Sequence, residues 1–122
     1  MLIENYYTVL SRRDEDEQTI FEVALNKDCK VYEGHFPGEP VSPGVCNIQM
    51  IRELAEQVAG HTLRLEYISQ CRFTTLITPL QHPTVEVRIS LQDNRLTASI
   101  GSADANYLTL KAETNNQTQT IE

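Results

Sequence analysis

The sequence has no run of about 18 apolar residues, the length at which a segment becomes a candidate membrane-spanning helix. Residues 1–5 also lack the basic and then apolar order of a signal peptide. We therefore expect a cytoplasmic protein. At 122 residues, with 40% hydrophobic and 22% charged residues, the composition predicts a single globular domain with a modest core.

Cysteine is scarce, and its spacing argues against two kinds of site. Cys29, Cys46 and Cys71 are odd in number and far apart, which favours neither a disulfide framework nor a paired-cysteine metal clamp. Adding His35 to these cysteines produces no recognisable ligand spacing, so we predict no metal site. We expect the cysteines to be small buried side chains.

Basic residues are outnumbered by acidic ones, 10 to 17, which gives a net charge of -7. This balance argues against nonspecific binding to nucleic acid or to anionic membranes, because both require a cationic surface. An acidic protein partner would need a local basic patch. The candidates for such a patch are Arg12, Arg13, Lys27, Lys30, Arg64 and Arg72.

Most of the chain has the pattern of β-strands. Residues 5–13 and 18–25 are rich in aromatic and β-branched side chains, and the acidic run 14–17 between them predicts an exposed hairpin turn. Further strands are expected at residues 63–75, 84–92, 95–101 and 107–113. Asp93 and Asn94 suit a tight turn between two of these strands.

One long helix is predicted between the two groups of strands. Ser42 and Pro43 resemble a helix start, and Gly60 suits a left-handed helix end. Apolar residues recur between them at steps of three and four, at Val45, Ile48, Ile51, Leu54, Ala55 and Val58. Charged side chains are confined to the second half, so we expect the first half to be deeply buried.

The order of these elements is a hairpin, a loop, one helix and a run of antiparallel strands. This order predicts an α+β fold in which an antiparallel sheet wraps around one long central helix. We assign residues 1–114 to one domain. Residues 115–122 are polar and are expected to form a frayed tail.

The segment before the helix carries the chemistry. Residues 34–45 read GHFPGEPVSPGV, so His35 lies on a loop stiffened by proline that leads directly into the helix. The first helix amides, at Gly44 and Val45, have no intrahelical partner and lie at the positive end of the helix dipole. They are suited to hold a thioester oxygen as negative charge develops on it. A neutral His35 nearby is suited to remove a proton from the adjacent carbon.

This segment resembles the signature of the 3-hydroxyacyl-acyl carrier protein dehydratases of the FabZ and FabA type. The helix that follows, the Arg72-Phe73 pair and the strand order extend the resemblance to about residue 113. The resemblance implies a hotdog fold and a dimer in which a histidine of one protomer meets a carboxylate on the other protomer's helix. It also implies His35 as the general base and Gly44 as the thioester-binding amide. We assign Phe36 and Val45 to substrate binding beside Gly44.

The chain departs from the family pattern where the carboxylate is expected, fourteen positions after the histidine. Gln49 stands there, and a carboxamide is not a practical proton donor. Glu53 stands one turn later, where the familiar dehydratases generally carry glutamine. Either Glu53 supplies the acid while Gln49 orients the hydroxyl, or the site is complete only beside a related subunit that carries its own carboxylate. The first explanation requires a displacement of about 5 to 6 Å along the helix.

The resemblance implies that the protein removes water from a 3-hydroxyacyl group on acyl carrier protein, with no metal or redox cofactor. Substrate would arrive on the carrier's phosphopantetheine arm. A specialised fatty acid, polyene or polyketide pathway fits the departure at Gln49. The alternative is a noncatalytic acyl-binding or partner subunit of a hotdog heteromer. A hotdog thioesterase is a third and weaker hypothesis.

Overall fold

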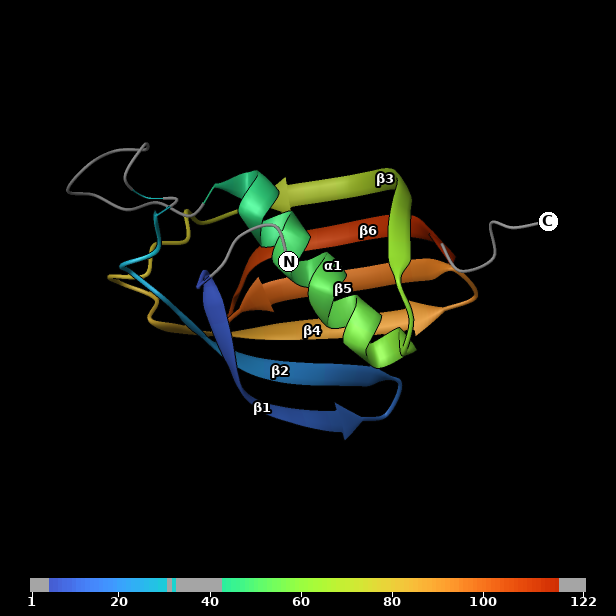
Figure 1. The fold of residues 1–122 in the computed structure, drawn as a ribbon, viewed down its shortest axis with the longest axis horizontal. Coiled ribbons are helices and arrows are strands. Elements are labelled where there is room, and N and C mark those ends of the chain that lie inside the picture. The colour runs from blue at the N-terminus through green and yellow to red at the C-terminus, as the bar shows by residue number, and fades with distance from the viewer. Residues whose placement is uncertain (1–4, 31, 33–42, 117–122) are drawn as a thin grey trace.

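The computed structural model describes residues 5–30, 32 and 43–116. Its elements, in chain order, are β1 (Tyr7–Glu15), β2 (Gln18–Leu25), α1 (Gly44–Ala59), β3 (Leu63–Phe73), β4 (Thr84–Gln92), β5 (Arg95–Gly101) and β6 (Asn106–Asn116). The strands form one antiparallel sheet in the order β1-β2-β4-β5-β6-β3. Helix α1 lies across one face of this curved sheet (Figure 1). The predicted arrangement of a sheet around one helix is therefore observed.

Two tight turns join consecutive strands. Asp93 and Asn94 both have positive φ, 53° and 66°, as a two-residue hairpin turn requires, and β4 and β5 have the predicted bounds. The β1–β2 turn is shorter than predicted. Asp14 and Glu15 belong to β1, and Asp16 turns the chain with a φ of 53°. Only the second half of the acidic run, residues 16 and 17, therefore forms the turn, because the strand pairing continues as far as Glu15.

The last strand is longer than its sequence pattern predicts. Asn115 and Asn116 pair with Arg64 and Leu63 at the start of β3. The Asn115 side chain also donates a hydrogen bond of 3.0 Å to Glu66. The strand expected at residues 107–113 therefore continues three residues further, because the backbone of β3 provides pairing partners that a polar sequence does not reveal.

Helix α1 ends as predicted and begins with an unusual cap. Gly60 has a φ of 82° and donates its amide to the Glu56 carbonyl at 2.8 Å, which closes the helix in the left-handed conformation. At the other end Pro43 occupies the N-cap position and provides no side-chain cap. Ser42, the expected capping residue, lies outside the described residues.

The buried face of α1 is rotated from the predicted stripe. Its buried residues are Cys46, Asn47, Met50, Ile51, Leu54 and Ala55. Val45 is 76% exposed, so the expectation of a deeply buried first half was wrong at this position. Cys46 and Asn47 occupy the core-facing side of the first turn instead. Buried Asn47 is satisfied by the Tyr6 hydroxyl, which donates to its Oδ1 at 2.7 Å.

The core lies between α1 and the concave face of the sheet. Alternate residues of the central strands point into it, including Phe21, Val23, Val87, Ile89, Ile100, Leu108 and Leu110. Within the described part of the chain, none of the helical structure is long and apolar enough to cross a membrane.

Strand β3 lies at one edge of the sheet and has an unusually exposed surface. Only its β6 side is paired within the described chain. Its apolar residues Tyr67, Ile68 and Phe73 are 61%, 39% and 47% exposed. An edge strand with exposed apolar side chains offers unpaired backbone groups to a second chain.

Candidate functional site

The start of α1 presents two backbone amides. The carbonyl of Pro43 accepts from the amides of Cys46 and Asn47 at 3.0 and 3.1 Å. Gly44 and Val45 therefore precede the first intrahelical bonds, and the Pro43 side chain does not cap them. Their N–H groups form the positive end of the helix dipole, which favours a developing negative charge.

An aromatic ring packs on the backbone at this helix start. A Cβ built on Gly44 would lie 3.1 Å from Cζ of Phe73 at the end of β3. Glycine at position 44 therefore permits the ring to approach the first turn closely. Phe73 is 47% exposed, so it forms an apolar surface beside the two amides.

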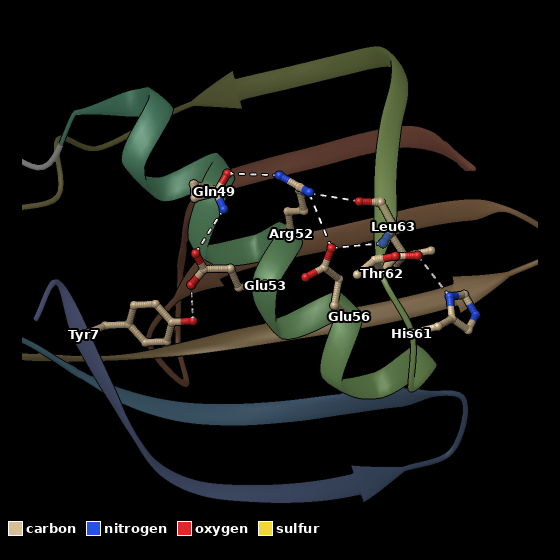
Figure 2. Close-up of polar contacts among 8 residues, drawn as sticks. All are labelled: Tyr7, Gln49, Arg52, Glu53, Glu56, His61, Thr62 and Leu63. Atoms are coloured by element: carbon tan, nitrogen blue, oxygen red, sulfur yellow. Dashed lines mark hydrogen bonds and ion pairs between the residues drawn. The ribbon is translucent and has the colours of Figure 1, made fainter. Parts of the chain in front are cut away.

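One turn further along α1, Gln49 and Glu53 are joined by a hydrogen bond. Gln49 Nε2 donates to Glu53 Oε2 at 2.9 Å, and both side chains are half-buried (Figure 2). Helical side chains lean toward the N-terminus, so the Glu53 carboxylate extends back to the Gln49 carboxamide. The displacement between the two Cα positions is thereby reduced to a hydrogen-bond distance between the two head groups.

The second oxygen of Glu53 accepts a hydrogen bond from a residue of the sheet. The hydroxyl of Tyr7, near the start of β1, donates to Glu53 Oε1 at 2.8 Å (Figure 2). Burial raises the pKa of Tyr7 well above its ordinary value, and the hydrogen bond to Glu53 and the negative charges of Glu53 and Glu56 raise it further. Tyr7 is therefore a neutral donor at physiological pH. Glu53 accepts hydrogen bonds at both oxygens, one from the helix and one from β1.

Arg52 connects this pair to the start of β3. Its Nη1 lies 3.5 Å from Gln49 Oε1, and its Nε donates to the Leu63 carbonyl at 2.9 Å. Glu56 completes the link, because its Oε2 accepts from the Leu63 amide at 2.9 Å and lies 3.5 Å from Arg52 Nε. The helix face that carries Gln49 and Glu53 is therefore fixed to strands on both sides, β1 and β3.

Tyr7 and Glu53 also line an open pocket of about 470 Å³. The rest of its lining comes from the end of α1 and the residues after it, namely Glu56, Gln57, His61 and Thr62. Glu53 is thus accessible from solvent on this side while its carboxylate remains hydrogen-bonded. His61 is exposed, with Nδ1 3.1 Å from the Thr62 carbonyl oxygen.

The structure brings together four of the six predicted site residues on one helix. Gly44 and Val45 form its first turn, and Gln49 and Glu53 follow on the next two turns. His35 and Phe36 lie outside the described residues, so their placement remains a prediction. Among the described residues, no group of three or more histidine, cysteine, aspartate or glutamate side chains is arranged to hold a metal ion.

Tyr7 and Arg52 were not identified as site residues from the sequence. No strand alternation separates Tyr7 from its neighbour, because Tyr6 precedes β1 and the hydroxyls of both tyrosines reach α1, at Asn47 and at Glu53. That Tyr7 meets Glu53, 46 positions later, depends on the tertiary fold.

The basic residues considered for an acidic partner do not gather on one element. They are Arg12 and Arg13 on β1, Arg64 and Arg72 on β3, and Lys27 and Lys30 between β2 and α1. Several are paired with neighbouring acids, at 2.7 Å for Arg13 with Glu15 and 2.7 Å for Arg64 with Glu66.

Comparison with known proteins identifies the class to which this fold and helix belong. The family model of ApeI-like proteins, described as ApeI dehydratase, matches residues 11–112. The chain therefore belongs to the ApeI-like dehydratase family.

Individual relatives agree with this assignment. The 3-hydroxyacyl-[acyl-carrier-protein] dehydratase FabZ of Levilactobacillus brevis is 31% identical, across 92% of this chain and 90% of the relative. FabZ of Haemophilus influenzae is 28% identical, and the match spans 73% of this chain and 64% of the relative. The dehydratase heterocomplex ApeI:P from Xenorhabdus doucetiae superposes with a TM-score of 0.75 at 19% identity, covering 88% of this chain and 96% of that one. The hotdog fold expected from the sequence is confirmed.

Proposed function

We propose that this protein removes water from a 3-hydroxyacyl thioester carried on acyl carrier protein in the cytoplasm, with Glu53 as the acid. The observation that carries the proposal is the 2.9 Å hydrogen bond between Gln49 and Glu53. It brings the Glu53 carboxylate to the carboxamide of Gln49, and Gln49 stands at the position where the family has its carboxylate. The family assignment, through FabZ relatives and the ApeI-like family model, supports the reaction class.

The reaction breaks a C–H bond at C2 and the C–O bond at C3, and it forms the C2–C3 double bond. His35 would take the C2 proton, and the amides of Gly44 and Val45 would stabilise the negative charge on the thioester oxygen. The departing hydroxyl needs a proton to leave as water. Glu53 would deliver it from its protonated carboxyl form, and the proton taken by His35 would return to Glu53 through solvent after each turnover. The free N–H of Gln49 would orient the hydroxyl.

Within a homodimer, the histidine of one protomer would work with Glu53 of the other. The exposed apolar edge at β3, with Tyr67, Ile68 and Phe73, supports an oligomer paired through this strand. Acyl carrier protein is the proposed carrier, and its phosphopantetheine arm would bring the substrate. The proposal needs no metal or redox cofactor.

Turnover by the purified chain alone tests this proposal. A 3-hydroxyacyl-acyl carrier protein is supplied, and the enoyl product is measured for the unmodified chain and for Glu53→Gln and His35→Ala. Loss of turnover in both variants, with unchanged folding, supports Glu53 as the acid. Full activity of Glu53→Gln would rule out this role.

A second candidate function is a partner subunit that works only beside a related hotdog chain. Two observations favour it. Both oxygens of Glu53 already accept hydrogen bonds within the chain, from Tyr7 and from Gln49, so neither is reserved for a substrate hydroxyl. The ApeI:P structure to which the chain is similar is a heterocomplex.

The two candidates differ in what restores activity. If the unmodified chain is inactive alone and gains turnover either from Gln49→Glu or from a co-purifying hotdog chain, the partner function is supported. A stable homodimer that turns over substrate without a second chain excludes it.

A further inference from the structure

We propose that Tyr7 is a positioning residue that holds the Glu53 carboxylate against Gln49 and thereby fixes the direction of the Gln49 carboxamide. This inference rests on the proposed function, because Tyr7 would hold Glu53, the proposed acid, in its working position. Tyr7 donates to Glu53 Oε1 at 2.8 Å, and Glu53 Oε2 accepts from Gln49 Nε2 at 2.9 Å. The three side chains form one continuous chain from β1 to α1 (Figure 2).

A glutamate at position 53 needs such a restraint. Its Cα lies one turn beyond that of Gln49, and its long side chain has several low-energy rotamers, most of which point the carboxylate elsewhere. The neighbouring pocket is open, so the carboxylate has room to turn toward solvent. A misplacement of about 1 Å at a reacting group can cost about 100-fold in rate. The hydrogen bond from Tyr7 opposes this rotation.

Tyr7 is itself held firmly enough to act as a restraint. Its backbone pairs with Leu25 of β2, and its ring packs on the core and meets Tyr6 edge to face with centroids 6.4 Å apart. The raised pKa of Tyr7 keeps its hydroxyl protonated, so it donates rather than accepts. The nearby cation, Arg52, contacts the Leu63 carbonyl and Glu56, and Tyr7 is the group that reaches Glu53 from the sheet.

The carboxamide of Gln49 is directed by the same chain of contacts. One of its N–H groups is directed at Glu53, and its oxygen faces Arg52 Nη1 at 3.5 Å. These two partners distinguish the nitrogen from the oxygen and set the plane of the amide. The second N–H of Gln49 is then available for the substrate hydroxyl.

The experiment compares Tyr7→Phe with Tyr107→Phe, which removes the same oxygen from β6, where the Tyr107 ring meets His82 with centroids 4.6 Å apart. The first readout is the pair of Gln49 side-chain amide resonances in ¹⁵N NMR spectra, assigned by their loss in Gln49→Glu. The second readout is kcat and KM for a 3-hydroxyacyl-acyl carrier protein. Folding of every variant is checked by circular dichroism.

Tyr7→Phe is expected to move the Gln49 amide resonances and to lower kcat about 10-fold or more, since it removes a hydrogen bond to a charged group. KM should stay within about twofold, because the lost contact does not involve the bulk of the substrate. Tyr107→Phe should change neither readout. In a Glu53→Gln background, Tyr7→Phe should have little further effect on residual turnover, because Tyr7 acts through Glu53.

Gln49 resonances and kcat that are both unchanged in Tyr7→Phe would overturn the inference. An equal loss of kcat in Tyr107→Phe would also overturn it, since the effect would then be general. If the unmodified chain has no turnover, the proposed function fails, but the NMR readout still decides the role of Tyr7. Resonances that move support the positioning of Gln49, and resonances that do not move refute it.

Discussion

Exchanging the residues at positions 49 and 53 tests whether the two side chains form one hydrogen-bonded unit. Gln49→Glu alone places a second carboxylate where Gln49 Nε2 now lies, 2.9 Å from Glu53 Oε2. Two unit charges about 4 Å apart repel by roughly 1 kcal/mol in water and about 4 kcal/mol near a protein surface. Both side chains are half-buried, and Arg52 offsets part of the repulsion. We therefore expect Gln49→Glu to lower the free energy of unfolding by about 1 to 3 kcal/mol at pH 7.

The double exchange, Gln49→Glu with Glu53→Gln, should recover most of this loss. The amide at position 53 then donates to the carboxylate at position 49, so the same hydrogen bond runs in the opposite direction. Tyr7 keeps an acceptor, and Arg52 gains a charged one. The net charge equals that of the unmodified chain, which removes a change of charge as the explanation.

The assay is denaturant unfolding at pH 7 and about pH 4.5, with melting temperature as a second measure. At about 2 cal/mol/K of unfolding entropy per residue, 122 residues correspond to roughly 4 °C for each kcal/mol. Acid should partly restore Gln49→Glu, because one carboxyl of a close pair takes up a proton. The matched control is Gln57→Glu, which adds a charge at the same spacing from Glu53 on an exposed position and should cost only about 0.2 to 0.5 kcal/mol.

Two results would refute the reasoning. Gln49→Glu as stable as the unmodified chain at both pH values would mean that the two head groups are not in contact. A double exchange no more stable than Gln49→Glu would mean that the hydrogen bond cannot be reversed.

Three further predictions concern the groups that hold α1 on the sheet. Tyr6→Phe removes the donor to buried Asn47 Oδ1 and should lower the free energy of unfolding by about 1 to 3 kcal/mol in denaturant titrations, whereas no change would show that water replaces the hydroxyl. Leu54→Ala, at a side chain with 0% exposure, should cost about 2 to 5 kcal/mol in the same measurement, and a loss below 1 kcal/mol would contradict its place in the core. The pKa of Tyr7 is raised above 10.0 in the folded protein, so the unfolded chain loses this proton first as pH rises. The free energy of unfolding should therefore fall as pH rises above 10, and it should fall less in Tyr7→Phe.

Local sequence patterns predicted the strands and turns well where local chemistry decides them. Asp93 and Asn94 tolerate positive φ, so the β4–β5 hairpin and its bounds were correct. Gly60 ended the helix for the same reason. The patterns failed where a partner decides the outcome. Polar Asn115 and Asn116 form a strand because β3 pairs with them, which composition does not reveal.

The sequence provided a list of candidate site residues but not their arrangement. The resemblance to the FabZ and FabA dehydratases, which implies a carboxylate fourteen positions after the histidine, identified Gln49, and it also drew attention to Glu53 one helical turn later. The apolar period placed Val45 inside, although the observed buried face passes through Cys46 and Asn47. Which side of a helix is buried depends on where the sheet lies.

The contacts of Glu53 lay beyond sequence reasoning for a related reason. Tyr7 reaches it across 46 positions of the chain, through strand pairing that only the folded protein defines. Once the fold is known, the direction of helical side chains explains how a residue one turn late can still meet Gln49. The departure at Gln49 therefore coincides with a hydrogen-bonding network that joins Gln49, Glu53 and Tyr7.

The most direct measurement is dehydration of a 3-hydroxyacyl-acyl carrier protein by the purified chain alone, compared with His35→Ala, Gln49→Glu and Glu53→Gln. The account predicts turnover by the unmodified chain and its loss in both His35→Ala and Glu53→Gln. An inactive unmodified chain together with an active Gln49→Glu would contradict it, and would assign this protein to the partner subunits.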